Sequence, residues 1–145
     1  MYFDDLKFGM SVDIAPAVIE KRKMMDFAYA YDNIPLHTDE AYAKNSPFGA
    51  LIAPGVMSFM SVSAKYLEVD FFGKELLAGK STKIEWYKPV YAEDILCGRA
   101  IITKLTQRNN KNGIVEITIE AYNQNNVLVL TNVTEAIVKC REDRC

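Results

Sequence analysis

The uncharged run LIAPGVMSFMSVSA, over Leu51–Ala64, constrains the fold of this chain more than any other feature. Pro54 suits the first turn of a helix, where its missing N–H group is harmless, so we predict a helix from Pro54 to about Val69. Its apolar side chains lie on more than one side, at Met57, Met60, Val62 and Ala64. A helix that is apolar nearly all round has to be wrapped by the rest of the chain.

Strand patterns fill the second half of the chain. Four segments rich in Ile, Val, Thr and Tyr are expected to be strands: residues 77–88, 94–106, 113–123 and 127–139. Along 113–123 apolar side chains alternate with Glu and Thr, which is typical of a half-buried strand. The segment 127–139 is apolar on both faces, so we expect it to be central or covered on both sides.

The first half begins with an extended piece, 11–19, which Pro16 interrupts. From Glu20 the apolar period changes to that of a helix ending near Asp32, with a stripe made by Met24, Phe27, Ala28 and Tyr31. The sequence Thr38-Asp39-Glu40 is a typical start for a short helix that ends near Asn45. The order is therefore one strand, then helices, then an antiparallel meander. It predicts a single α+β domain over residues 1–145, with a curled antiparallel sheet wrapped around the long central helix.

Composition excludes several classes of protein. A net charge of -2 with interspersed acids and bases gives no nucleic-acid surface. The acidic start MYFDDLKFGM does not resemble a signal peptide, and the longest uncharged run is too short to cross a membrane. One histidine and the scattered Cys97, Cys140 and Cys145 do not make a zinc site within one chain, and they favour reduced thiols. We expect a cytoplasmic protein without a metal.

The segment Tyr31–Ser63 holds the candidate active site. It contains the only histidine, His37, five residues after Asp32, with Pro35 between them. A carboxylate and an imidazole can hold a water between them, and the N–H groups at the start of the next helix can hold an oxyanion. By themselves Asp32 and His37 also fit ordinary turn chemistry, with Asp capping backbone N–H groups and His as a polar core residue.

The combination resembles the hydratase motif of the MaoC-like, or (R)-specific enoyl-CoA hydratase, family. That motif reads Asp-x-Asn-Pro-x-His, and Asp32, Pro35 and His37 match it in register. Further matches are Gly55 at the start of the central helix, Ser63 within it, the opening FDDLKFGM, and WYKPVYAEDI, which is similar to the family's Phe-x-x-Pro-Val-x-x-Gly-Asp. The chain departs from the family at Ile34, where the family has Asn, and at Ala53-Pro54-Gly55-Val56, which replaces Val-His-Gly-Met.

The resemblance implies a hot-dog fold that pairs sheet edge to sheet edge, giving a homodimer or a higher oligomer of dimers. It implies reversible hydration of trans-2-enoyl thioesters to (R)-3-hydroxyacyl thioesters, with no cofactor other than coenzyme A as part of the substrate. Asp32 and His37 would activate water, and the Gly55 N–H would bond the thioester oxygen. Pro54 would support the helix start, and Ser63 would hydrogen-bond Asp32 or, alternatively, its own helix.

Several alternatives stay open at the level of sequence. Ile34 is either an exposed, neutral change or a residue that narrows and dries the pocket. The other candidate functions are a non-catalytic acyl-thioester binder, the inactive half of a heterodimeric dehydratase, and an acyl-CoA thioesterase. The thioesterase is disfavoured because residues 56–64 carry no acid. Nothing in the sequence separates a coenzyme A carrier from an acyl-carrier protein, and no basic residue is assigned to the carrier.

Overall fold

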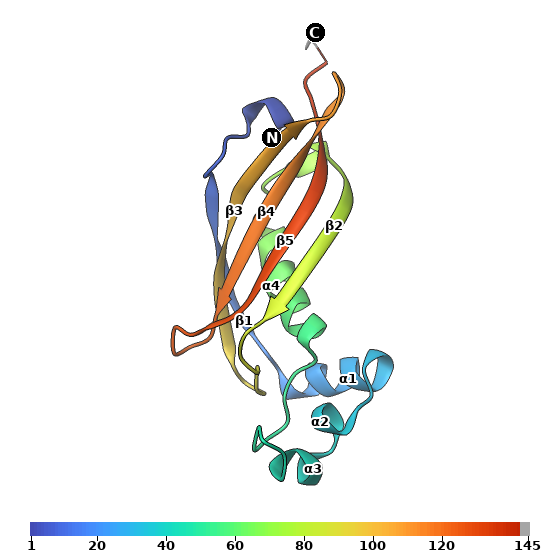
Figure 1. The fold of residues 1–145 in the computed structure, drawn as a ribbon, viewed down its shortest axis with the longest axis vertical. Coiled ribbons are helices and arrows are strands. Elements are labelled where there is room, and N and C mark those ends of the chain that lie inside the picture. Colours follow the sequence, from blue (N-terminus) through green and yellow to red (C-terminus); the bar gives the residue numbers. More distant parts are fainter. Residues whose placement is uncertain (143–145) are drawn as a thin grey trace.

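The computed structural model describes residues 1–142, and Cys145 therefore lies outside the described residues. Its centre is one antiparallel sheet with the strand order β1-β3-β4-β5-β2 (Figure 1). The strands are β1 (Ser11–Val18), β2 (Leu76–Trp86), β3 (Ile95–Gln107), β4 (Asn112–Tyr122) and β5 (Leu128–Lys139). All four predicted strands occur, but only β3, β4 and β5 form a meander, because β2 pairs with β5 at the edge of the sheet and not with β3. The last of them, β5, is hydrogen-bonded on both sides, although its outer face is only half-buried.

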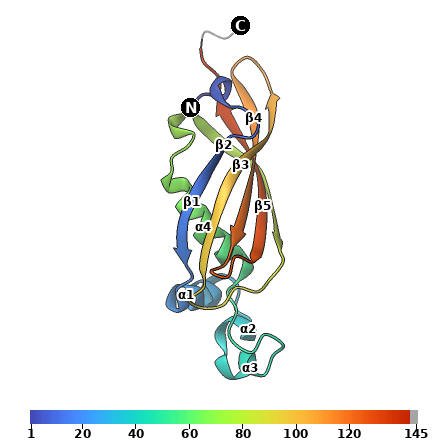
Figure 2. The same ribbon diagram turned by 90° about the vertical axis from the view of Figure 1, so that its left-hand side faces the viewer.

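Helix α4 (Gly55–Glu68) lies along one face of the sheet (Figure 2). Met57 and Val62 are buried against the strands, and the inward side chains of β4 are 0–5% exposed. The helix occurs where it was predicted, with Pro54 as its N-cap residue. It is not wrapped all round, however, because Val56, Met60 and Leu67 are 46%, 53% and 61% exposed. The sheet curls around one side of α4 and leaves an apolar stripe on the other.

The two edges of the sheet differ. β1 pairs with β3, and its register shifts between Ile14 and Ala17, the place where Pro16 cannot donate a ladder hydrogen bond. β2 forms the other edge, and all but one of its residues are exposed. An open strand edge of this length is a template for pairing with a further strand.

Three short helices project from one end of the sheet (Figures 1 and 2). They are α1 (Lys21–Tyr31), α2 (Pro35–Thr38) and α3 (Glu40–Lys44), and two 3-10 turns, Phe3–Asp5 and Gly73–Glu75, lie elsewhere in the chain. Met24 and Ala28 bury the stripe of α1, but Tyr31 is 80% exposed, so its assignment to that stripe is wrong. The α3 prediction is confirmed, because the Asp39 side chain accepts a hydrogen bond from the Tyr42 N–H. Among residues 1–142, no helix combines the length and apolar character needed to cross a membrane.

Candidate active site

His37 lies within α2, a single helical turn that was not predicted from the sequence and that directly precedes the predicted helix α3. Pro35 occupies the first turn of α2, and the His37 side chain is buried. Its Nδ1 lies 2.7 Å from the Ile52 carbonyl oxygen. A carbonyl only accepts hydrogen bonds, so Nδ1 carries the hydrogen. In the neutral ring Nε2 therefore presents a lone pair.

Asp32 meets that lone pair from the end of α1. It is the C-cap residue of the helix, and its own N–H donates to the Ala28 carbonyl at 2.9 Å. One carboxylate oxygen, Oδ2, lies 3.3 Å from His37 Nε2, and the Asp32 side chain is 44% exposed whereas that of His37 is 7% exposed. The structure thus brings the two residues together as an open carboxylate beside a buried imidazole.

The backbone of Ile52 joins this pair to the start of α4. Its carbonyl takes the His37 hydrogen bond, while its N–H donates to the Leu36 carbonyl at 3.2 Å. The next residue, Ala53, donates its N–H to the Val90 carbonyl at 2.7 Å. Pro54 then follows, fully buried. Two successive peptide groups therefore hold the histidine, the helix start and the loop after β2 in one arrangement.

Gly55 begins α4, and its N–H is one of the helix amides without an intrahelical partner. No side chain caps this end of the helix. A cavity of about 500 Å³ joins the helix start to the Asp–His pair, and it is lined by Asp32, His37, Phe48, Ile52, Ala53, Gly55, Val56, Ser58, Trp86, Tyr87, Lys88, Pro89 and Val90. The three residues expected to do chemistry, Asp32, His37 and Gly55, thus share one cavity.

Trp86, the last residue of β2, packs directly on Gly55. A Cβ atom added to Gly55 would lie 2.5 Å from Cε2 and 2.7 Å from Nε1 of the indole. Only glycine fits there while the indole keeps its place. The segment WYKPV indicated the family, but Trp86 was not predicted to belong to the site. The available signal was an aromatic residue at the end of a strand, directly before a segment shared with the family.

Ile34 contributes its backbone to the site. Its carbonyl accepts hydrogen bonds from the His37 N–H at 3.0 Å and from the Thr38 hydroxyl at 3.1 Å. Its side chain is 43% exposed and does not line the cavity. The change from the family's asparagine therefore falls at a surface side chain on the outer side of α2.

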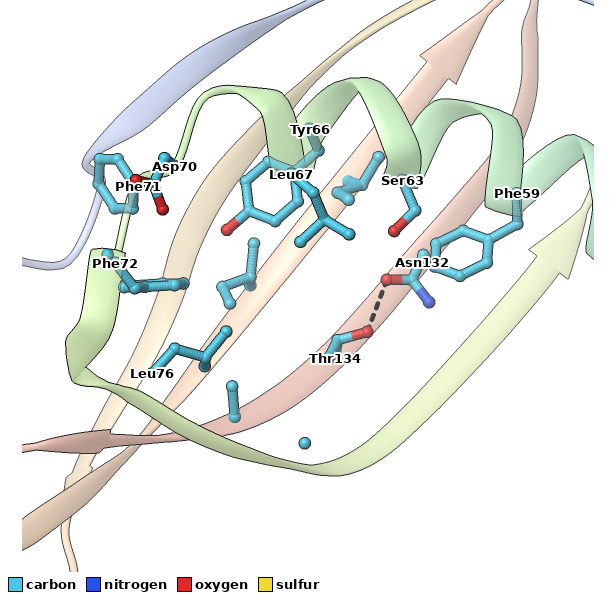
Figure 3. A pocket seen from close by; sticks show the side chains of 15 residues that line it. Phe59, Ser63, Tyr66, Leu67, Asp70, Phe71, Phe72, Leu76, Asn132 and Thr134 are labelled. Atoms are coloured by element: carbon cyan, nitrogen blue, oxygen red, sulfur yellow. Dashed lines mark hydrogen bonds between the residues drawn. The ribbon is translucent and has the colours of Figure 1, made fainter.

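Ser63 lines a second cavity, of about 200 Å³, between the C-terminal half of α4 and the sheet (Figure 3). Ser58 and Ser61 each donate to the carbonyl four residues earlier, but the Ser63 hydroxyl has no hydrogen-bond partner among the described residues and points into this cavity. Asp32 lines the first cavity only. Within one chain, the structure does not bring Ser63 and Asp32 together.

The second cavity is mainly apolar. Its walls include Phe59, Leu67, Phe72, Leu76 and Ile119. Two of its polar side chains are tied to each other, since the Thr134 hydroxyl donates to Asn132 Oδ1 at 2.8 Å (Figure 3), and Asn132 Nδ2 also donates to the Thr82 hydroxyl at 2.6 Å.

Burial raises the pKa of Tyr66, another lining residue, to about 12, so its hydroxyl is neutral at physiological pH. No charged group other than Asp70 lines the second cavity. An apolar guest fits such a cavity better than a charged one.

The donor set of the first cavity suits proton transfer and oxyanion binding. Within residues 1–142, no cluster of three His, Cys, Asp or Glu residues could hold a metal ion. A carboxylate beside an imidazole can accept and return protons, and free N–H groups can bind an oxyanion. Together such groups can add or remove water beside a carbonyl group.

The chain belongs to the MaoC-like domain family, whose model matches residues 5–125. Over 140 residues it is 26% identical to the uncharacterized protein YdeM of Bacillus subtilis, covering 96% of this chain and 99% of that protein. It is 33% identical to an (R)-specific enoyl-CoA hydratase of Rhodospirillum rubrum over 63 residues, which is 43% of this chain and 44% of the hydratase.

Solved structures agree with the fold. A structure described as a monoamine oxidase regulatory protein from Archaeoglobus fulgidus superposes with a TM-score of 0.92 at 26% identity, covering 97% of this chain and 95% of that one. The (R)-hydratase of A. caviae, described as involved in PHA biosynthesis, superposes with a TM-score of 0.74 at 25% identity, covering 94% and 98% of the two chains. The hot-dog fold that the resemblance implied is therefore confirmed.

Proposed function

We propose that this protein is a hydro-lyase that reversibly hydrates trans-2-enoyl thioesters to (R)-3-hydroxyacyl thioesters. One observation carries the proposal: the Asp32 carboxylate, the lone pair of His37 Nε2 and the free N–H at Gly55 face one cavity. The family of MaoC-like dehydratases supports it, as does the local match to an (R)-specific enoyl-CoA hydratase.

Asp32 and His37 act on the water. Because Nδ1 is committed to the Ile52 carbonyl, Nε2 and the carboxylate are both hydrogen-bond acceptors. A water molecule has two hydrogens to donate, so it satisfies both acceptors and turns an oxygen lone pair outward. Asp32 takes one proton as the water oxygen bonds to C3 of the enoyl group. A proton returns from the pair to C2 on the same face, which completes a syn addition.

The start of α4 stabilises the charge that develops on the thioester oxygen. The N–H of Gly55 lies at the positive end of a helix of 14 residues. The absence of a side chain at Gly55 lets the Trp86 indole pack beside this N–H group. Removing a donor of this kind typically costs about 2.7–4 kcal/mol of barrier.

A second copy of the chain completes the site in this proposal. Trp86, at one end of the exposed strand β2, contacts the start of α4, whereas Leu76, at the other end, lines the apolar cavity. Antiparallel pairing of β2 with the β2 of a second copy would set the Asp–His cavity of one protomer beside the apolar cavity of the other. The acyl chain would then extend from the water site into the 200 Å³ cavity. The homodimer would also cover the open edge and the apolar stripe of α4.

Each competing function predicts a different set of residues in the site. Thioester hydrolysis on this fold is disfavoured by the absence of acidic side chains between Val56 and Ala64. A non-catalytic binder, or an inactive subunit of a heterodimer, has no need for a histidine held in one tautomer beside a carboxylate. The carrier, coenzyme A or acyl-carrier protein, is left open by the residues of the cavity.

Hydration of crotonyl-CoA by the purified protein is the test. Loss of the enone absorbance with an (R)-3-hydroxybutyryl product is the expected result. If crotonyl-CoA and octenoyl-CoA are not hydrated, either alone or presented on acyl-carrier protein, the proposal fails. Release of free coenzyme A without consumption of the enone would indicate a thioesterase instead.

A further inference from the structure

Trp86 lines the cavity, and the mechanism above does not use its chemistry. Its indole packs on Gly55, and Nε1 lies 2.7 Å from the position that a Gly55 Cβ would occupy. An indole N–H is a hydrogen-bond donor and has no acceptor capacity. Among residues 1–142 this N–H has no hydrogen-bond partner, and the Trp86 side chain is half-exposed.

We infer that the Trp86 N–H is a second hydrogen-bond donor to the thioester oxygen, beside the N–H of Gly55. The inference rests on the proposed function, because it names a further residue of the same site. Gly55 and Trp86 are in contact, and both line the cavity that holds the Asp–His pair. A carbonyl oxygen has two lone pairs and accepts two such bonds, and the negative charge on it grows as water adds to C3.

The position offers a substitution that removes the donor and keeps the ring. The family segment similar to WYKPV begins with Phe, which has an aromatic ring but no donor. Trp86 stands at that position. The Trp86→Phe substitution therefore keeps a ring against Gly55 and removes the N–H alone. It separates a donor from a residue that only fills space.

The expected effect of Trp86→Phe is a loss of kcat of about 10- to 100-fold on crotonyl-CoA, since one of two donors is removed. The KM should stay within about 3-fold, because the bond strengthens mainly in the transition state. Tyr122→Phe is the matched control. It also removes one aromatic-side-chain donor, which bonds Glu120 outside the cavity, and it should leave kcat unchanged. Equal kcat values for Trp86→Phe and the parent would overturn the inference.

A spectroscopic measurement tests the bond without turnover. The conjugated thioester 2,4-hexadienoyl-CoA absorbs at longer wavelength when hydrogen bonds polarise its carbonyl group. We expect a red shift on binding to the Asp32→Asn form of the protein, and a smaller shift when Trp86→Phe is added. An unchanged shift in the double variant would contradict a donor role.

The parent protein offers a further readout, because Trp86 is its only tryptophan. Titration with butyryl-CoA, which is saturated and cannot be hydrated, should change the tryptophan emission, with excitation chosen to avoid the adenine ring. An unchanged emission at saturating ligand would overturn the inference, even if Trp86→Phe failed to fold. Hydration by the parent together with a silent Trp86 would reject the inference and leave the proposed function standing. Absence of hydration by the parent would reject both.

Discussion

The two ends of helix α4 face two different kinds of cavity. At its start, free N–H groups, a carboxylate and an imidazole gather on loops and on a one-turn helix beyond the sheet. Along its C-terminal half, the cavity lies between helix and sheet and is lined mainly by apolar side chains, and its polar residues Asn132 and Thr134 are hydrogen-bonded to each other. Reactive groups are thus held at the periphery, where water and substrate have access. The apolar side chains of the second cavity are built into the core, where, on the proposed function, they would select the acyl chain.

The largest effect expected at the reactive end comes from Asp32→Asn, which keeps the size of the side chain and removes the base. Hydration should fall by about 10²- to 10⁴-fold, while butyryl-CoA still binds. Steady-state kinetics and a binding titration measure the two quantities. Asp26→Asn, on the exposed side of α1, is the control and should hydrate at the parent rate. An Asp32→Asn form as active as the parent would remove the basis of the mechanism.

Gly55→Ala tests how tightly the Trp86 indole packs against the start of α4. The added methyl group would lie 2.5–2.8 Å from three atoms of the Trp86 indole, so the ring or the helix start must move. We expect a loss of about 100-fold in kcat and a destabilisation of about 1–3 kcal/mol, read from turnover and thermal unfolding. Gly79→Ala, where the new methyl meets nothing within 4 Å, should not lower the melting temperature. A Gly55→Ala protein with parental turnover and stability would show that the contact is loose.

Ser63→Leu probes the other end of α4 by filling part of the 200 Å³ cavity. Turnover of crotonyl-CoA should stay within about 3-fold of the parent, while octenoyl-CoA should lose about 10- to 200-fold in kcat/KM. The kcat/KM values for the two substrates give the ratio directly. Ser61→Leu, on a different side of α4, should leave that ratio unchanged. Equal losses on both substrates would mean that the second cavity does not select the acyl chain separately from the chemistry at the first cavity.

The smallest effect concerns Tyr66 at high pH. Burial raises its pKa to about 12, so the unfolded chain loses this proton at lower pH than the folded one. The stabilising contribution is complete below pH 10 and is lost as the pH rises from 10 to about 12. Allowing for partial exposure, it is on the order of 1 kcal/mol. The free energy of unfolding, measured with urea at several pH values, should fall less from pH 10 to about 12 in Tyr66→Phe than in the parent. An equal fall in both proteins would argue that the hydroxyl reaches solvent.

Regular elements could be predicted from sequence because their signals extend over many residues. The alternation along β4 and the long apolar run of α4 determined position and type together. The one-turn helix α2 was missed because four residues beginning with Pro35 have no measurable period. The prediction that the rest of the chain wraps α4 all round overestimated the burial of this helix. An apolar stripe indicates that a surface is covered, but it does not indicate that the same chain covers it.

The candidate site was predictable where residues are near in sequence. The pair of Asp32 and His37 is five residues apart, and a motif of that length can be matched directly. Trp86 reaches Gly55 through the path of the edge strand, 31 positions along the chain, and no local pattern encodes that contact. The cavity that Ser63 lines depends likewise on how α4 is rotated over the sheet. Packing determines that rotation, and the periodicity of the sequence does not.

The backbone hydrogen bonds of Ile52 and Ala53 have a kinetic consequence. The Ile52 carbonyl holds the histidine and the Ile52 N–H holds α2, while the adjoining N–H of Ala53 holds the loop after β2. These bonds cannot open one at a time without leaving a buried polar group unsatisfied. Local fluctuations should therefore disrupt them together, and the amide hydrogens of Ile52 and Ala53 should exchange with deuterium at one shared rate. The lifetime of the catalytic arrangement would then be readable from two backbone amides that take no part in the chemistry.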